Sequence, residues 1–108
     1  MKIKRITTIV PTEYLDKFER CLRTAGVPGM TIDNVKGFGE HANYFSTDLL
    51  RSNVRIEVYI GEERCNEICE AIKCFAAETR TPAGILVIEP IDQLIDLNTG
   101  QDILADRL

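Results

Sequence analysis

The chain has 108 residues, of which 44% are hydrophobic and 28% charged, and it carries a formal net charge of −4 with a pI near 5.0. A chain of this length has room for one domain with a small core, so oligomerisation is a reasonable expectation. The acidic balance, without a strongly basic patch, argues against a nucleic-acid partner. No apolar run approaches the ~20 residues that cross a bilayer, and residues 1–11 lack the apolar stretch of a signal peptide. We therefore expect a cytoplasmic protein with reduced thiols and no direct membrane insertion.

The first third of the chain predicts a strand, a helix and a second strand. Residues 3–10 are rich in Ile, Val and Thr, which is typical of a strand. Pro11 and Thr12 predict the start of a helix with Thr12 as its N-cap. Gly26 suits the left-handed residue that ends such a helix, and residues 29–36 predict the second strand. The apolar stripe of this helix comprises Tyr14, Leu15, Phe18, Cys21, Leu22 and Ala25.

Residues 35–39, with the sequence V-K-G-F-G, end the second predicted strand. A polar stretch of 14 residues follows from Glu40 to Asn53. Two glycines on either side of one aromatic residue let the backbone turn sharply and come close to another group. A loop this long inside a compact domain is usually functional or disordered. The sequence therefore marks this segment for attention.

The remaining part repeats the strand–helix–strand order. Apolar and polar residues alternate over 54–60, which is the clearest strand pattern in the chain. Gly61 ends that strand, and Glu62 and Glu63 suit the positive end of a following helix. A turn-like segment at 80–84 leads to a fourth strand. The apolar stripe of the second helix comprises Cys65, Ile68, Cys69, Ile72, Phe75 and Ala76.

The four cysteines lack the C-x-x-C spacing of a metal site, so neither a disulfide scaffold nor a structural zinc site is expected. Cys21, Cys65 and Cys69 face the predicted core, where they act as small buried hydrophobes. The alternative for Cys65 and Cys69 is a redox pair. Cys74 lies about 180° from Cys65 around the helix, so it is the expected exposed thiol.

The order β-α-β, loop, β-α-β predicts a ferredoxin-like α+β domain in which both helices cover one face of a four-stranded antiparallel sheet. Residues 85–88, I-L-V-I, are apolar without alternation, as in a strand that is buried on both faces. The C-terminal segment, residues 90–108, is one candidate cover for the second face. Packing of sheet against sheet between subunits is the simpler solution.

Five stretches together match one family in its own order. The chain resembles the PII signalling proteins, which are trimers of ferredoxin-like subunits, over roughly its first hundred residues. The stretches are 25–31 (A-G-V-P-G-M-T), 35–39 (V-K-G-F-G), 54–58 (V-R-I-E-V), 84–87 (G-I-L-V) and 99–100 (T-G).

The resemblance implies a single PII-like domain over residues 1–108 that assembles as a homotrimer with its sheets facing inward. Residues 40–53 correspond to a shortened T-loop, residues 80–84 to the B-loop and residues 90–108 to the C-terminal segment. Adenine nucleotides bind the family in clefts between neighbouring subunits, so the resemblance implies an adenine nucleotide as effector ligand, with no other cofactor.

The family pattern assigns three groups of residues to this nucleotide. Thr31, Glu57 and Tyr59 would lie near the adenine, residues 37–39 would line the cleft at the base of the T-loop, and residues 82–84 would form the B-loop side. Thr31 and Glu57 can hydrogen-bond an adenine edge. The complete implied set, with two cations that offset phosphate charge, is Thr31, Lys36, Gly37, Phe38, Gly39, Glu57, Tyr59, Arg80, Pro82, Ala83 and Gly84.

Three positions depart from the family pattern. Ile85 replaces the lysine of the B-loop, and Asp96 and Asn98 replace the two arginines of the C-terminal R-x-R. Arg55, with Lys36 and Arg80, offsets this loss only in part. Because missing cations cost most for the most charged ligand, we expect AMP or ADP to be favoured over ATP. His41 replaces a glutamine of members that sense 2-oxoglutarate, so that sensing is not expected here.

The expected output is regulation of a partner protein, such as a membrane transporter or an enzyme, through the loop at 40–53. This loop lacks the modified-tyrosine motif of the family, so Tyr44 is expected to make contacts rather than to be uridylylated. The chain shows no nucleophile elbow, no P-loop and no paired His and Cys, so we do not expect an enzyme. The apolar loop residues that would contact the partner are Tyr44, Phe45, Leu49 and Leu50.

The alternative is a divergent PII-like or CutA-like trimer that has lost nucleotide binding and binds a metal ion or a small anion. His41, beside Glu40, is the sole histidine and would give a metal at a trimer axis one ligand per subunit. A lone histidine without a second clustered ligand is more often a polar loop residue, so no metal ligand is assigned. The V-K-G-F-G run favours PII over CutA.

Overall fold

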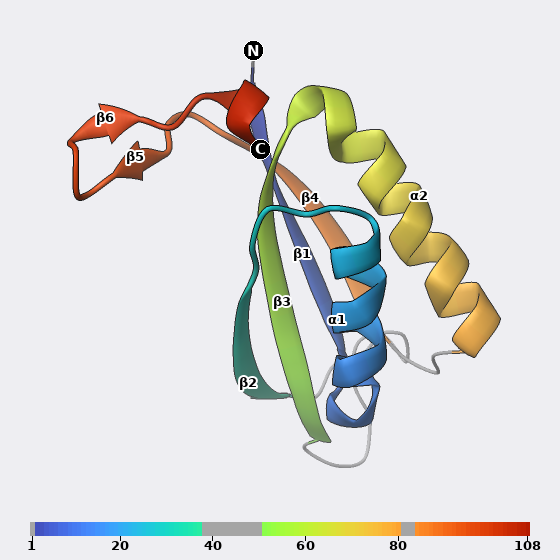
Figure 1. Cartoon of the computed structure of the whole chain (residues 1–108). Helices are drawn as coiled ribbons and strands as arrows, with labels where there is room; N and C mark the ends of the chain where they lie inside the picture. Colours follow the sequence, from blue (N-terminus) through green and yellow to red (C-terminus); the bar gives the residue numbers. More distant parts are fainter. Residues whose placement is uncertain (1, 38–50, 81–83) are drawn as a thin grey trace.

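The structure is a computed structural model, and it describes residues 2–37, 51–80 and 84–108. Its elements follow one another as two strand–helix–strand units and a small C-terminal hairpin (Figure 1). In chain order they are β1 (Ile3–Pro11), a 3₁₀ turn (Thr12–Tyr14), α1 (Leu15–Thr24), β2 (Thr31–Gly37), β3 (Arg51–Gly61), α2 (Glu62–Thr79), β4 (Ile85–Ile91), β5 (Ile95–Asp96), β6 (Gln101–Asp102) and a final 3₁₀ turn (Ala105–Arg107).

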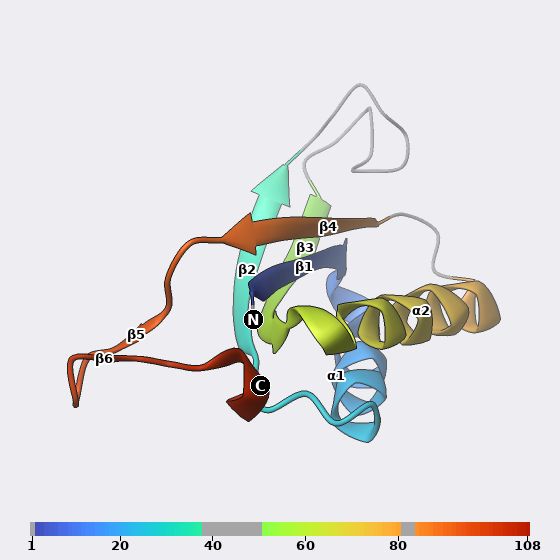
Figure 2. The same cartoon turned by 90° about the horizontal axis from the view of Figure 1, so that it is seen from above.

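The four long strands form one sheet in the order β2-β3-β1-β4, and every neighbouring pair is antiparallel. Both helices lie on the same side of this sheet (Figure 2). This arrangement confirms the predicted ferredoxin-like α+β fold of a single chain. None of the helices in the described residues is long and apolar enough to span a bilayer.

The core lies between the sheet and the helices. Successive side chains of a strand face opposite sides, so every second residue of β3 from Val54 to Ile60 points to the helices. These side chains are at most 2% exposed. Phe18 of α1 and Phe75 of α2 close the layer with an edge-to-face contact, with ring centroids 5.0 Å apart and planes at 77°. The largest fully buried side chains are Phe18, Ile6, Leu22, Ile56, Ile60, Ile68, Val54 and Val58.

The sequence predicted the order and type of the strands and helices more accurately than the residues at which they begin and end. Thr12 makes no side-chain cap, because a 3₁₀ turn over residues 12–14 precedes α1 and Pro11 is still part of β1. The predicted N-cap was therefore wrong. Gly26 has the expected positive φ of 83°. β3 begins at Arg51, so the last three residues of the predicted loop belong to the sheet, and residues 38–50 lie outside the described part of the chain.

The fourth strand is less buried in one chain than its composition predicts. β4 is an edge strand that pairs only with β1, and Ile88 is 48% exposed. The C-terminal hairpin does not cover the second face of the sheet, because β5 and β6 project away from the body of the domain (Figures 1 and 2). Leu97 of this hairpin is 96% exposed. The side of the sheet away from the helices thus stays open in a single subunit.

We predict that Gly61→Ala destabilises the fold. A Cβ atom at Gly61 would lie 2.6 Å from the backbone oxygen of Ala105, so the C-terminal segment would have to move. We expect the free energy of unfolding to fall by about 1–3 kcal/mol in urea titrations. Gly29→Ala is the control, because a Cβ there meets nothing within 4 Å and should change stability by no more than about 0.5 kcal/mol. Equal effects of the two substitutions would contradict the packing of Gly61 against Ala105.

Candidate functional site

A hollow of about 350 Å³ lies at the beginning of β2 and brings together three residues that the sequence singled out. Thr31 of β2 pairs directly with Glu57 of β3, and Tyr59 follows two residues later on the same face of β3. Register thus places these side chains together on the open face of the sheet. The complete lining is Pro28, Gly29, Met30, Thr31, Glu57, Tyr59, Leu94, Ile103 and Leu108.

Arg64, near the start of α2, fixes two walls of this hollow. Its guanidinium donates hydrogen bonds to the carbonyl oxygens of Ala25 at 2.9 Å, Gly26 at 3.1 Å and Leu108 at 3.4 Å. It therefore binds the end of α1, the segment that leads into β2 and the C-terminus of the chain. Carbonyls at the end of a helix have no intrahelical partner, so Arg64 also caps α1.

The charges around the hollow are already paired. Among the described residues that line the hollow, Glu57 is the one with a charged side chain. Arg55 is bidentate to Asp33, with Nη2–Oδ2 and Nε–Oδ1 distances of 2.7 and 3.1 Å, and its Nε lies 3.9 Å from Oε1 of Glu57. These carboxylates hold the pKa of Arg55 above its ordinary value, chiefly through the hydrogen bonds to Asp33. A small ring with hydrogen-bonding edges suits this hollow better than a multiply charged group.

Other residues of the predicted site lie far from this hollow within one chain. Lys36 and Gly37 are at the opposite end of β2, where they pair with residues 52 and 51. Lys36 lies five residue steps along the strand from Thr31, which is about 17 Å. Gly84 immediately precedes β4, which is the edge strand on the opposite side of the sheet from β2. The backbone of Gly84 packs closely on β1, since an added Cβ atom would lie 2.9 Å from the carbonyl oxygen of Ile9.

Arg80 ends α2 with a left-handed φ of 52° and is exposed. One chain therefore does not gather all the predicted residues in one place. The others fall outside the described residues, and their positions stay predictions: Phe38, Gly39, His41, Tyr44, Phe45, Leu49, Leu50, Pro82 and Ala83.

The three departures from the family pattern lie on β4 and on the C-terminal hairpin. Ile85 pairs with Ile9 of β1. Asp96 begins the hairpin turn, where its Oδ1 accepts a hydrogen bond from the backbone N–H of Asn98 at 2.8 Å and its carbonyl accepts one from Gly100 at 2.7 Å. The carboxylate of Asp96 thus supports a turn, and none of these three positions supplies a cation.

Sequence reasoning missed the residues that close the hollow from the C-terminal side. Leu94, Ile103 and Leu108 belong to a segment without strand or helix periodicity, so no pattern pointed to them. Pro28 and Met30 lie inside the A-G-V-P-G-M-T stretch and were available from it. In the described part of the chain no group of three or more His, Cys, Asp and Glu residues is arranged to hold a metal ion.

Comparison with known proteins identifies the relatives of this chain. The family profile described as nitrogen regulatory protein P-II matches residues 3–101. A nitrogen regulatory protein P-II from Cereibacter sphaeroides is 30% identical in an alignment 108 positions long that covers 92% of this chain and 95% of the relative. Proteins of the same name from Mesorhizobium japonicum and Pasteurella multocida are 29% and 26% identical, with 92% and 93% of this chain and 95% and 96% of the relatives covered.

The four thiols differ in burial, as the helical stripes predict. Cys69 is buried, Cys21 and Cys65 are half-buried, and Cys74 is exposed. Burial, and then the neighbouring Cys65, raises the pKa of Cys69 to about 11. Burial, and then the charge of Glu78, also raises the pKa of Cys21. These environments favour inert thiols over a redox pair, since the thiolate is the reactive form.

We predict that Cys74 reacts first with a thiol reagent such as DTNB at pH 8. A pKa of about 11 in place of 9.0 lowers the thiolate fraction of Cys69 roughly a hundredfold. Cys74→Ser should remove the fastest phase of the reaction, whereas Cys69→Ser should leave it unchanged. A fast phase that survives Cys74→Ser would contradict the assigned exposure.

Proposed function

The chain belongs to the nitrogen regulatory protein P-II family, and we propose that it is a signalling regulator that senses an adenine nucleotide and acts on a partner protein. The nucleotide binds in clefts between the subunits of a homotrimer. The loop at 40–53 carries the state of the cleft to a transporter or an enzyme. The protein acts by binding, and no catalytic step is assigned to it.

One observation carries the nucleotide proposal. Thr31, Glu57 and Tyr59, which the family pattern assigns to the adenine, line a single hollow of about 350 Å³. The Thr31 hydroxyl both donates and accepts hydrogen bonds, and the Glu57 carboxylate accepts them, so together they match the donor and acceptor groups of an adenine edge. The apolar lining from Met30, Leu94 and Ile103 suits the faces of the ring.

The charges favour a ligand with few phosphates. No Lys or Arg lines the hollow among the described residues, and Arg55 is already bound to Asp33 and Glu57. A triphosphate needs cations that offset its charge. We therefore propose that AMP or ADP is the effector, with ATP no better than either.

Three features of the single chain support assembly into an oligomer, which we propose to be the homotrimer of the family pattern. The face of the sheet away from the helices is open, and the projecting hairpin exposes Ile95 and Leu97 by 46% and 96%. In addition, Thr31 and Gly84 lie at opposite edges of the sheet. A second subunit that supplies the β4 edge to the β2 edge of its neighbour would complete the cleft.

A second candidate function is a trimer that binds a small anion or a metal ion without a nucleotide. The absence of cations at Ile85, Asp96 and Asn98 favours it, because those positions hold the phosphate-binding residues of the family pattern. The hollow at Thr31 favours the first candidate. A titration with nucleotides and with divalent metals separates the two.

For the nucleotide, we predict that AMP or ADP binds at least as tightly as ATP in isothermal titration calorimetry. Thr31→Val removes one hydrogen-bonding group and should weaken binding by roughly threefold to tenfold. Thr24→Val is the matched control, because Thr24 is also exposed but lies on α1, outside the hollow, and it should bind like the parent chain. A clear preference for ATP would overturn the proposed ligand, and binding of a metal without any nucleotide would favour the second candidate.

For the assembly, we predict a mass three times the 12.2 kDa of one chain in light scattering at micromolar concentration. The exposed side chains of Ile95 and Leu97 on the hairpin provide apolar surface that a subunit interface buries. A monomer mass under these conditions would refute the trimer, and with it a cleft that needs two subunits.

A further inference from the structure

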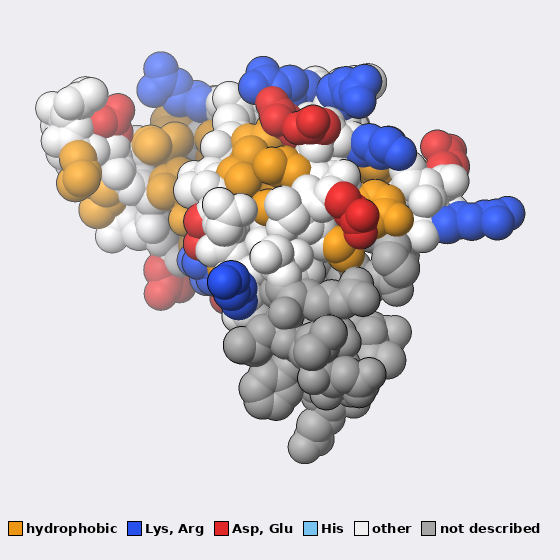
Figure 3. All heavy atoms as spheres, turned by 90° about the horizontal axis from the view of Figure 1, so that it is seen from below, with side chains coloured by type: hydrophobic (Ala, Val, Ile, Leu, Met, Phe, Trp, Pro, Cys, Tyr) orange, Lys and Arg blue, Asp and Glu red, His pale blue; other side chains and the backbone are white. Residues whose placement is uncertain are grey.

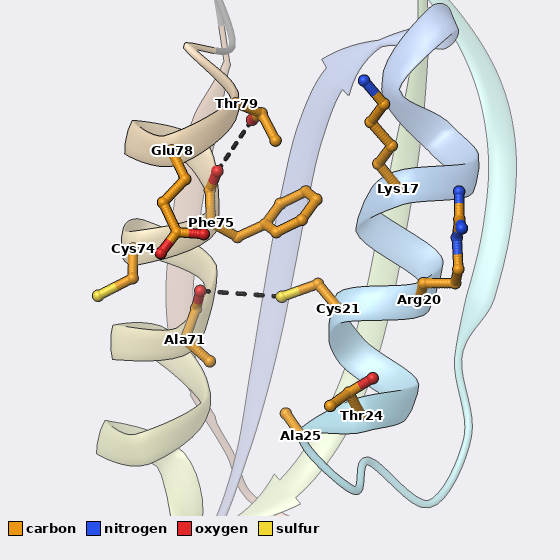
Figure 4. Close-up of a pocket in the computed structure, with 10 residues that line it drawn as sticks. All are labelled: Lys17, Arg20, Cys21, Thr24, Ala25, Ala71, Cys74, Phe75, Glu78 and Thr79. Atoms are coloured by element: carbon orange, nitrogen blue, oxygen red, sulfur yellow. Dashed lines mark hydrogen bonds between the residues drawn. The ribbon is translucent and has the colours of Figure 1, made fainter.

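A larger hollow, of about 630 Å³, lies between α1 and α2 on the helix side of the molecule (Figure 4). We call it the interhelical groove. Its α1 wall follows the spacing i, i+3, i+4, i+7, i+8, which marks one stripe along a helix. The residues of this wall, the last of them at the C-cap of α1, are Lys17, Arg20, Cys21, Thr24 and Ala25.

The α2 wall repeats the same spacing with Ala71, Cys74, Phe75, Glu78 and Thr79. The two stripes run in opposite directions, since Ala71 lies beside Cys21 and Thr79 lies at the Lys17 end (Figure 4). Each spans eight residue steps, or about 12 Å of helix. The groove is thus as long as two to three turns of a third helix.

The floor of the groove is formed by apolar side chains, two of them small. The Cys21 thiol points at the carbonyl oxygen of Ala71, 3.8 Å away. The Phe75 ring points from α2 towards α1 and rests on Phe18, so it is held in place from below. Alanine and cysteine side chains let another helix come close, and an aromatic ring offers a large contact surface.

The α1 wall carries two cations that have no ionic partner among the residues that the structure describes. Arg23 pairs with Glu19 at 2.9 Å and Lys73 pairs with Glu70 at 2.7 Å, whereas Lys17 and Arg20 form no ion pair with the described residues. In the view from below, basic, acidic and apolar side chains alternate on the surface (Figure 3), so the charge of the groove follows from its own lining residues. The groove is therefore apolar along its floor and positive along one wall, and Glu78 is the single acidic residue of the other.

We propose that the interhelical groove is a docking site for an amphipathic helix of a partner protein. This helix places apolar side chains on Ala71 and Phe75 and an acidic side chain against Lys17 and Arg20. A helix laid in an apolar groove is a recurring mode of recognition. Complementary charge fixes its orientation and raises its rate of association.

A partner helix fits this surface better than a second copy of the chain. The groove is concave, and its filling needs a free convex ridge with an apolar stripe. The outward ridges of α1 and α2 are largely charged, with exposed residues such as Asp16 and Arg23 on α1 and Glu67 and Glu70 on α2, so neither offers an apolar stripe to a second copy. The site lies on the opposite side of the sheet from Thr31 and Glu57, so neither of these residues belongs to it.

The test uses the full-length protein and two synthetic helical peptides of 15 residues with the same apolar stripe. One peptide has Glu and the other has Lys at the positions that flank the stripe. We expect the Glu peptide to bind about fivefold tighter in fluorescence anisotropy at low salt, and added salt to reduce this difference. Lys17→Glu with Arg20→Glu should reverse the preference. Lys2→Glu with Arg107→Glu, which changes the net charge equally but outside the groove, should leave it unchanged.

A steric variant makes the test independent of charge. Ala71→Trp fills the groove and should lower the affinity for both peptides at least about tenfold. Ala77→Trp is the control, because Ala77 is exposed on the same helix but does not line the groove. Circular dichroism verifies that each variant is folded.

Equal affinity for the two peptides, binding that Ala71→Trp does not weaken, or no binding at all would overturn the proposal. A change in the mass of the free protein on Ala71→Trp would show that a second copy fills the groove, which also contradicts it. None of these results bears on the nucleotide titration, so the two proposals fail separately.

Discussion

The pairing of β3 with both β1 and β2 is the constraint on which the rest of this molecule depends. From Val54 to Ile60 the even-numbered residues, such as Ile56, face the helices, while Arg55, Glu57 and Tyr59 face the open side. A slip of one residue would exchange the two faces, so burial of the even set fixes the register. The same register places Thr31 opposite Glu57. The packing of the core therefore positions the hollow.

Most of the fold followed from periodicity, because the alternation over 54–60 and the two helical stripes are direct consequences of burying one face. Periodicity predicted the ends of the strands and helices less accurately. Thr12 is a residue type that often caps helices, but β1 extends to Pro11 and a 3₁₀ turn lies between this strand and α1. Similarly, β3 extends to Arg51 because it pairs with β2 as far as Gly37. Such ends are set by tertiary pairing, which a local pattern does not encode.

The candidate site was predictable in part. The family resemblance named Thr31, Glu57 and Tyr59, and register brings them together. Leu94 and Leu108 were not predictable, since the C-terminal segment acquires its position through contacts such as the bond from Arg64 to the last carbonyl. The interhelical groove was not predicted, because Cys21 and Ala25 of its α1 wall belong to the predicted core stripe and the other residues of that wall, Lys17, Arg20 and Thr24, are polar.

One short segment connects the two hollows. Ala25 lines the interhelical groove, and the chain reaches the hollow at Thr31 with Pro28, three residues later. Arg64 holds this segment at Ala25 and Gly26 and holds the wall of the hollow at Leu108. Proximity by itself is not coupling, since an occupant of the groove changes affinity in the hollow only if it binds two states of the segment unequally. The hydrogen bonds from Arg64 to the backbone oxygens of Ala25, Gly26 and Leu108 would have to differ between these two states.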